Sequence, residues 1–107
     1  MLIRVTQPGR PAFQLRPGEL GKSVFDETAI EPPLAEEEVL DAFRPGSTLI
    51  AVSESEIEAA GLKVELIPGA DILPERLRES HREIRPSQQL SRADFKRALQ
   101  RLESHGY

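Results

Sequence analysis

Cysteine is absent from the 107 residues, so the chain has no disulfide, no thiolate zinc site and no cysteine nucleophile. The two histidines, His81 and His105, are too few to build a histidine metal cage. We therefore expect no protein-built metal site. A chain without cysteine suits a reducing compartment, and we expect the protein to work in the cytoplasm.

Long hydrophobic runs are missing as well. The longest, 49–52, is far too short to span a bilayer, and residues 1–7 have a strand-like pattern instead of the apolar stretch of a secretory signal. The net charge of −4 argues against a protein that coats nucleic acid. We expect no membrane contact and no direct nucleic-acid footprint.

The chain does have enough apolar material for one core. It is 38% hydrophobic and 30% charged, close to the composition of ordinary globular proteins. Nine prolines divide it into short elements, and no segment is long enough to act as a linker. We therefore predict that residues 1–107 form a single domain.

The hydrophobic pattern predicts a small α+β fold. Pro-Gly turns separate short β-prone segments, and the nearly continuous apolar run at 47–52 is typical of a central strand. Ser53 and Ser91 each stand three residues before an acid, as helix N-caps do. The expected strands are 2–6, 12–16, 23–26, 47–52, 63–67 and 81–86, and the expected helices are 34–44, 54–60 and a terminal helix from residue 91, with one or two helical turns at 75–79.

Three familiar catalytic signatures are missing. The chain has no Gly-x-Ser-x-Gly elbow and only one plausible histidine, which argues against a serine hydrolase. It also has no Walker loop and no dinucleotide glycine fingerprint. The acidic run 36–38 is typical of a solvated helix surface and not of a catalytic carboxylate pair.

One segment with chemical potential is 18–26. Gly21 allows a close backbone approach, Ser23 offers a small hydroxyl that can hold a ribose, and Phe25 follows on the other side of the strand from its neighbour Val24. The plainer alternative is a turn glycine, an exposed serine and a core phenylalanine.

A second such segment is 77–86, which is dense in groups that bind anions and transfer protons, His81 and Glu83 among them. It belongs to a basic C-terminal third, where residues 75–107 carry eight Lys or Arg against five Asp or Glu. The plainer alternative is a charged edge strand, which blocks aggregation.

Together these segments resemble the ADP-ribosyltransferase-like effector toxins delivered by type VI secretion. Residues 21–26, Gly-Lys-Ser-Val-Phe-Asp, are similar to a Gly-Thr-Ser-Val-Phe-Asp type segment of that family. Residues 69–74 are similar to its Gly-x-Asp-Ile-x-Pro run, and Arg76, Leu77, His81, Ile84 and Pro86 match its Arg-Leu-x-x-x-His-x-x-Ile-x-Pro pattern.

The resemblance implies an ADP-ribosyltransferase-like split antiparallel sheet with two to three helices, gripping NAD as a substrate in a central cleft. An arginine would bind the diphosphate, a hydroxyl would order the ribose strand, and a carboxylate would stabilise the positive charge that develops on the ribose. The residues expected to contact NAD are Arg4, Gly21, Ser23, Phe25 and His81, and those expected to act in catalysis are Ser23 and Glu83.

The resemblance also implies partners: an unknown macromolecular acceptor of ADP-ribose, and an immunity or antitoxin protein that blocks the cleft. The chain departs from the family in two places. Lys22 replaces a threonine, and Glu83 has no counterpart in the family pattern, so its role rests on its position in a late strand. The chain is also shorter than the toxins it resembles.

A different class of function stays open from the sequence. The charged late strand and the terminal helix could form the interface of a non-enzymatic binding module, such as an antitoxin, immunity or adaptor protein.

Overall fold

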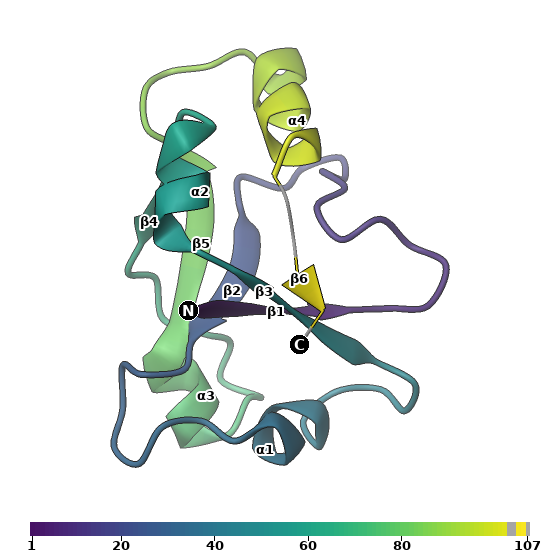
Figure 1. Cartoon of the computed structure of the whole chain (residues 1–107), viewed down its shortest axis with the longest axis vertical. Coiled ribbons are helices and arrows are strands. Elements are labelled where there is room, and N and C mark those ends of the chain that lie inside the picture. The colour runs from purple at the N-terminus through teal and green to yellow at the C-terminus, as the bar shows by residue number, and fades with distance from the viewer. Residues whose placement is uncertain (103–104, 107) are drawn as a thin grey trace.

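An antiparallel β-sheet forms the middle layer of the protein in a computed structural model that describes residues 1–102 and 105–106 (Figure 1). Within those residues the strand order is β4-β5-β2-β1-β3-β6, and every neighbouring pair is antiparallel. The strands are β1 Leu2–Thr6, β2 Lys22–Asp26, β3 Thr48–Val52, β4 Leu62–Glu65, β5 His81–Pro86 and the two-residue β6 His105–Gly106. The expected α+β class is confirmed.

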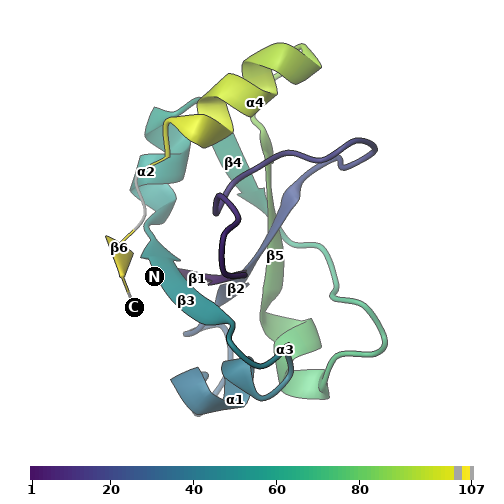
Figure 2. The ribbon, with the colours of Figure 1, turned by 90° about the vertical axis from the view of Figure 1, so that its right-hand side faces the viewer.

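Helices cover both faces of the sheet (Figure 1, Figure 2). The described part of the chain has four of them, one more than the two to three that the resemblance implied, and none is long and apolar enough to cross a membrane. On one face lie α1 Glu36–Leu40 and α3 Glu75–Ser80; on the other lie α2 Glu54–Ala59 and α4 Arg92–Gln100.

Each face has its own hydrophobic core, because strand side chains alternate between the two faces. The α1–α3 core consists of Ile3, Phe25, Leu34, Val39, Leu49 and Leu77. The larger α2–α4 core consists of Leu2, Phe13, Leu15, Val24, Val52, Ile57, Leu62, Ile84, Phe95, Ala98, Leu99 and Leu102.

The sheet is narrowly joined between β1 and β2. β1 pairs with β3 over five registered residues and β2 pairs with β5 over four, whereas β1 and β2 share only Leu2 with Asp26 and Ile3 with Phe25. Beyond that point the two strands diverge (Figure 1). The sheet therefore has two halves: one consists of β1, β3 and β6, and the other of β2, β5 and β4.

The local signals for α2 and α4 are confirmed. The Ser53 hydroxyl accepts a hydrogen bond from the Glu56 N–H at 3.1 Å and completes the capping box of α2, and Gly61 ends that helix with a φ of +82°. The Ser91 hydroxyl accepts from the Asp94 N–H at 3.1 Å at the start of α4.

The strand expected at 12–16 was wrong. Phe13 and Leu15 are buried, whereas Gln14 and Arg16 are exposed, so the alternation reflects burial. The backbone of 12–16 nevertheless has no ladder partner. Its carbonyls are instead held by cationic side chains: Ala12 O accepts from Arg4, Gln14 O from Lys22 at 2.9 Å, and Arg16 O from Arg92. These side chains donate the hydrogen bonds that a neighbouring strand would otherwise give to the carbonyls.

The central position expected for 47–52 was also wrong. β3 lies beside β1 and the short β6, away from the centre of the sheet. Its apolar run is nevertheless buried on both faces, because Leu49 belongs to the α1–α3 core and Val52 to the α2–α4 core.

The helix expected at 34–44 is shorter than the pattern predicted. α1 ends at Leu40, where the backbone tightens: the Ala42 and Phe43 N–H groups bond the carbonyls three residues back, Val39 O at 3.2 Å and Leu40 O at 3.1 Å. Phe43 nevertheless packs inward, with its ring 6.0 Å from that of Phe25.

An ion pair between Arg76 and Glu38 connects α3 to α1. Arg76 Nε lies 2.6 Å from Glu38 Oε2, and Arg76 Nη2 donates to the Pro32 carbonyl at 2.6 Å. The hydrogen bond from Arg76 holds the pKa of Glu38 below its ordinary value. This contact fixes α1 and α3 beside each other on the same face of the sheet.

Shortening the Leu77 side chain of α3 tests the α1–α3 core. Leu77 has no exposed surface, so Leu77→Ala leaves a cavity and should lower the free energy of unfolding by about 2–5 kcal/mol in chemical denaturation. Ile72, five residues earlier, is 91% exposed, and the control Ile72→Ala should stay within about 0.5 kcal/mol of the parent. Equal effects of the two variants would contradict the packing of α3.

Candidate functional site

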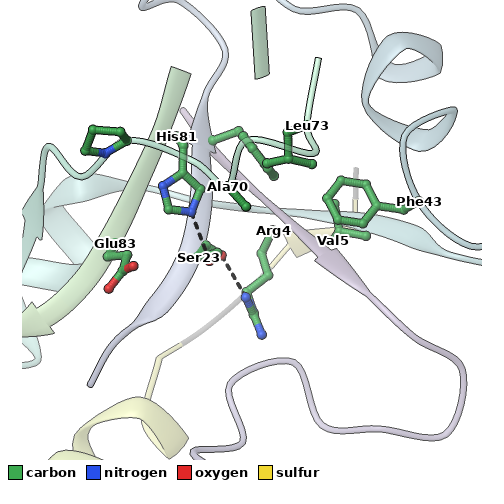
Figure 3. Close-up of a pocket in the computed structure, with 10 residues that line it drawn as sticks. Arg4, Val5, Ser23, Phe43, Ala70, Leu73, His81 and Glu83 are labelled. Carbon is green, nitrogen blue, oxygen red and sulfur yellow. Dashed lines mark hydrogen bonds between the residues drawn. The ribbon is translucent and has the colours of Figure 1, made fainter. Parts of the chain in front are cut away.

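A pocket of about 300 Å³ lies beside the point where β1 and β2 diverge (Figure 3). Side chains from three strands meet there with one from the turn after α1 and three from the loop between β4 and α3. The lining residues are Arg4, Val5, Ser23, Phe25, Phe43, Pro68, Ala70, Leu73, His81 and Glu83. The structure therefore brings together Arg4, Ser23, Phe25, His81 and Glu83, the residues that the sequence singled out, with the exception of Gly21.

The register of β2 and β5 explains this convergence. Ser23 lies opposite Glu83 and Phe25 lies opposite His81. Directly paired residues of antiparallel strands share a face, as do residues two apart in one strand, so all four side chains project from the same side of the sheet.

His81 is held by two hydrogen bonds. Its Nδ1 lies 2.7 Å from the Ile67 carbonyl oxygen, which can only accept, so Nδ1 carries a proton. In the neutral imidazole Nε2 is then an acceptor, and it lies 3.0 Å from Ser23 Oγ, whose hydroxyl donates (Figure 3). His81 is only 6% exposed, and its ring meets Phe25 edge-on at 5.6 Å, so its orientation is fixed.

Arg4 reaches across the gap between the diverging strands. Its Nη1 donates to the Ser23 carbonyl at 2.7 Å, its Nε donates to the Ala12 carbonyl, and its guanidinium lies 5.7 Å from the centre of the Phe13 ring. Burial lowers the pKa of Arg4, while the attraction of Glu19 opposes that shift. A guanidinium stays protonated regardless, so a partly buried positive charge lies at the edge of the pocket.

A second pocket of about 280 Å³ adjoins the first and shares Arg4 and Ser23 with it. Its charged lining consists of three cations, Arg4, Arg16 and Lys22, and one carboxylate, Glu19. A pocket with this balance favours an anion.

Lys22 is almost completely buried beside this second pocket, with 4% of its surface exposed. Its ammonium donates to Glu19 Oε1 at 2.9 Å and to the Gln14 carbonyl, and burial lowers the pKa of Lys22. Partial burial raises the pKa of Glu19, but hydrogen bonds from Lys22 and the Arg16 N–H outweigh it and bring that pKa below its ordinary value. Glu19 thus holds the lysine with an ionised carboxylate.

Glu83 is oriented by Arg85. Arg85 Nη2 and Nε donate to Glu83 Oε1 at 2.9 and 3.1 Å, so these two hydrogen bonds fix the position of the carboxylate at the wall of the pocket.

Gly21 does not line the first pocket, but it sets how closely β5 approaches β2. A Cβ on Gly21 would come within 2.7 Å of Glu83 Oε1 and 2.9 Å of the Ile84 carbonyl oxygen. The close backbone approach at this glycine is made to β5, and a contact between Gly21 and NAD stays a prediction.

Sequence reasoning missed part of the site. Phe43 was assigned to a helix face, Arg16 to a strand, and Lys22 was noted only as a departure from a family pattern. Leu73 lies in the stretch 69–74, which the sequence marked without indicating that it walls a pocket. The missing information is the path of the loops, which no short-range pattern encodes.

The plainer alternative for 77–86, a charged strand at the edge of the sheet, was wrong. β5 lies between β4 and β2 and is paired on both sides, so its backbone is not available to a partner. In comparisons with known proteins, no family model, no curated protein and no solved structure matches the chain.

Substituting Gly21 tests the close approach of β2 and β5. Gly21→Ala should lower the free energy of unfolding by about 1–3 kcal/mol in chemical denaturation, because the added Cβ overlaps a backbone oxygen. The double variant Gly21→Ala/Glu83→Ala removes only the carboxylate contact, so most of the cost should remain relative to Glu83→Ala alone. Full recovery in that background, or no cost in the single variant, would contradict the backbone contact.

Proposed function

We propose that the protein is a small cytoplasmic toxin that binds NAD in the two adjoining pockets and transfers ADP-ribose to an intracellular macromolecule. The observation that carries this proposal is that the residues expected to act on NAD meet in one pocket. Arg4, Ser23, Phe25, His81 and Glu83 were selected from separate sequence segments for roles around NAD, and they line one pocket.

The shape of the sheet supports the same proposal. The resemblance implies a split antiparallel sheet with NAD in the cleft. Here two halves of an antiparallel sheet meet over two registered residue pairs, and both pockets lie where they separate.

The second pocket suits the diphosphate of NAD. A diphosphate carries concentrated negative charge, and guanidinium and ammonium groups bind it through charge-assisted hydrogen bonds. Arg4 and Arg16 supply guanidinium groups, and the buried charge of Lys22 adds to the attraction. Arg4 also lines the first pocket. A ligand that runs from one pocket into the other therefore passes Arg4.

The first pocket suits the nicotinamide ribose. Phe25, Phe43 and Leu73 give it apolar walls for a flat ring. Ser23 Oγ donates its proton to His81 and can accept a hydrogen bond from a ribose hydroxyl. Mixed walls of this kind fix the orientation of a bound nucleoside.

Glu83 is the residue that would act on the scissile bond. Breaking the bond between nicotinamide and ribose develops positive charge on the ribose carbon, which a preorganised carboxylate stabilises. Glu83 lies opposite Ser23 in the sheet, and Arg85 holds its carboxylate in place.

A neutralising partner would cover the mouth of the site. Two apolar side chains of the loop that contributes to the first pocket are largely exposed, Leu66 at 74% and Ile72 at 91%. We expect an immunity or antitoxin protein that covers the site to contact these two side chains.

Calorimetric titration with NAD tests the proposal. The parent protein should bind, and Arg4→Lys should weaken binding about tenfold or more, because lysine keeps the charge but loses the planar fork of donors. Ser23→Ala should weaken it about three- to tenfold through one lost hydrogen bond. The control Arg97→Ala removes a charge from the exposed side of α4 and should bind like the parent.

Two outcomes would contradict the proposal: no heat of binding up to millimolar NAD with a folded protein, or equal weakening by Arg97→Ala and Arg4→Lys. Either result would favour the non-enzymatic binding module, with the exposed face of α4 as its interface.

A further inference from the structure

Ser23 and His81 have the geometry of a nucleophile and its base. A serine hydroxyl is a weak nucleophile until a base accepts its proton, and that base must itself be oriented by a third group. The sequence argued against this chemistry because it has no Gly-x-Ser-x-Gly elbow and only one plausible histidine. The structure places Ser23 Oγ 3.0 Å from His81 Nε2 and the Ile67 carbonyl 2.7 Å from His81 Nδ1.

The hydrogen bonds define the direction of proton transfer. The Ile67 carbonyl fixes the tautomer in which Nδ1 is protonated, which leaves Nε2 free to take the Ser23 proton. His81 is buried and its ring is held edge-on against Phe25, so the imidazole cannot turn away from the serine without disturbing the α1–α3 core.

The surroundings suit a small acyl substrate. Ser23 is exposed at a pocket of about 300 Å³ whose walls include Phe25, Phe43 and Leu73, which can accept a short acyl or aryl group. The guanidinium of Arg4 is bonded to the Ser23 carbonyl and lines the same pocket, so a positive charge lies close to an oxyanion formed at the serine.

We propose that Ser23 and His81 form a nucleophile–base dyad that accepts acyl groups from small esters. Ser23 Oγ bonds to the ester carbonyl carbon, the bond from that carbon to the alcohol oxygen breaks, and His81 Nε2 carries the serine proton to the departing alcohol. Water then attacks the acyl-serine with His81 as base, which releases the carboxylic acid and restores the hydroxyl. No metal, cofactor or redox partner takes part.

This activity goes beyond the proposed handling of NAD. There the Ser23 hydroxyl only accepts a hydrogen bond from a ribose hydroxyl, whereas here it forms a covalent bond. The test below contains no NAD, so its failure leaves the calorimetric titration to stand or fall separately.

A fluorophosphonate probe tests the dyad directly, because attack by Ser23 Oγ forms a bond to phosphorus, expels fluoride and leaves a permanent label. Mass spectrometry of peptides should map the label to Ser23. Ser23→Ala should abolish it, and Ser55→Ala, a change at an exposed serine of α2, should leave it unchanged. The parent should also release para-nitrophenol from para-nitrophenyl acetate, and Ser23→Ala should not.

The role of His81 is tested with His81→Asn, whose amide nitrogen can keep the hydrogen bond to the Ile67 carbonyl but cannot act as a base. Labelling should slow about a hundredfold or more. If this variant does not fold, the mapped label on the parent decides. A folded parent without label at Ser23, equal labelling of Ser23→Ala, or a folded His81→Asn that labels at the parental rate would overturn the dyad.

Discussion

The hydrogen bond from Arg4 to the Ser23 carbonyl is the contact on which the rest of the site depends. β1 and β2 share only two registered pairs, and Arg4 spans the gap that opens immediately after them. If β1 and β2 stayed paired here, a backbone N–H would donate to the Ser23 carbonyl. Arg4 would then not lie between the strands, where it lines both pockets. The Arg4 side chain therefore links the two diverging strands and also lines both pockets.

Cationic side chains take the place of a β-ladder over the loop that follows β1. Arg4, Lys22 and Arg92 satisfy carbonyls of residues 12–16, while Phe13 and Leu15 anchor the loop in the α2–α4 core. A consequence is that a protein of net charge −4 has a locally cationic pocket beside its sheet. The cations that hold this loop therefore also make the neighbouring pocket positively charged.

Local signals in the sequence predicted local structure well. The caps at Ser53 and Ser91 depend on residues three positions apart, and both are present. Two predictions were wrong, the strand at 12–16 and the central position of β3, because the partners of a strand are set by segments far away in the sequence. The grouping of Ser23 with Glu83 required the β2–β5 register, and the hydrogen bond from Ser23 to His81 joins residues that no spacing rule relates.

The most direct test of a single NAD site between the sheet halves is to map amide chemical shifts of isotope-labelled protein by NMR as NAD is added. The account predicts shifts in β1, β2 and β5 around Arg4, Ser23 and His81, with the buried residues of α2 and α4 unaffected. Shifts confined to α4, or an unchanged spectrum at millimolar NAD, would contradict it.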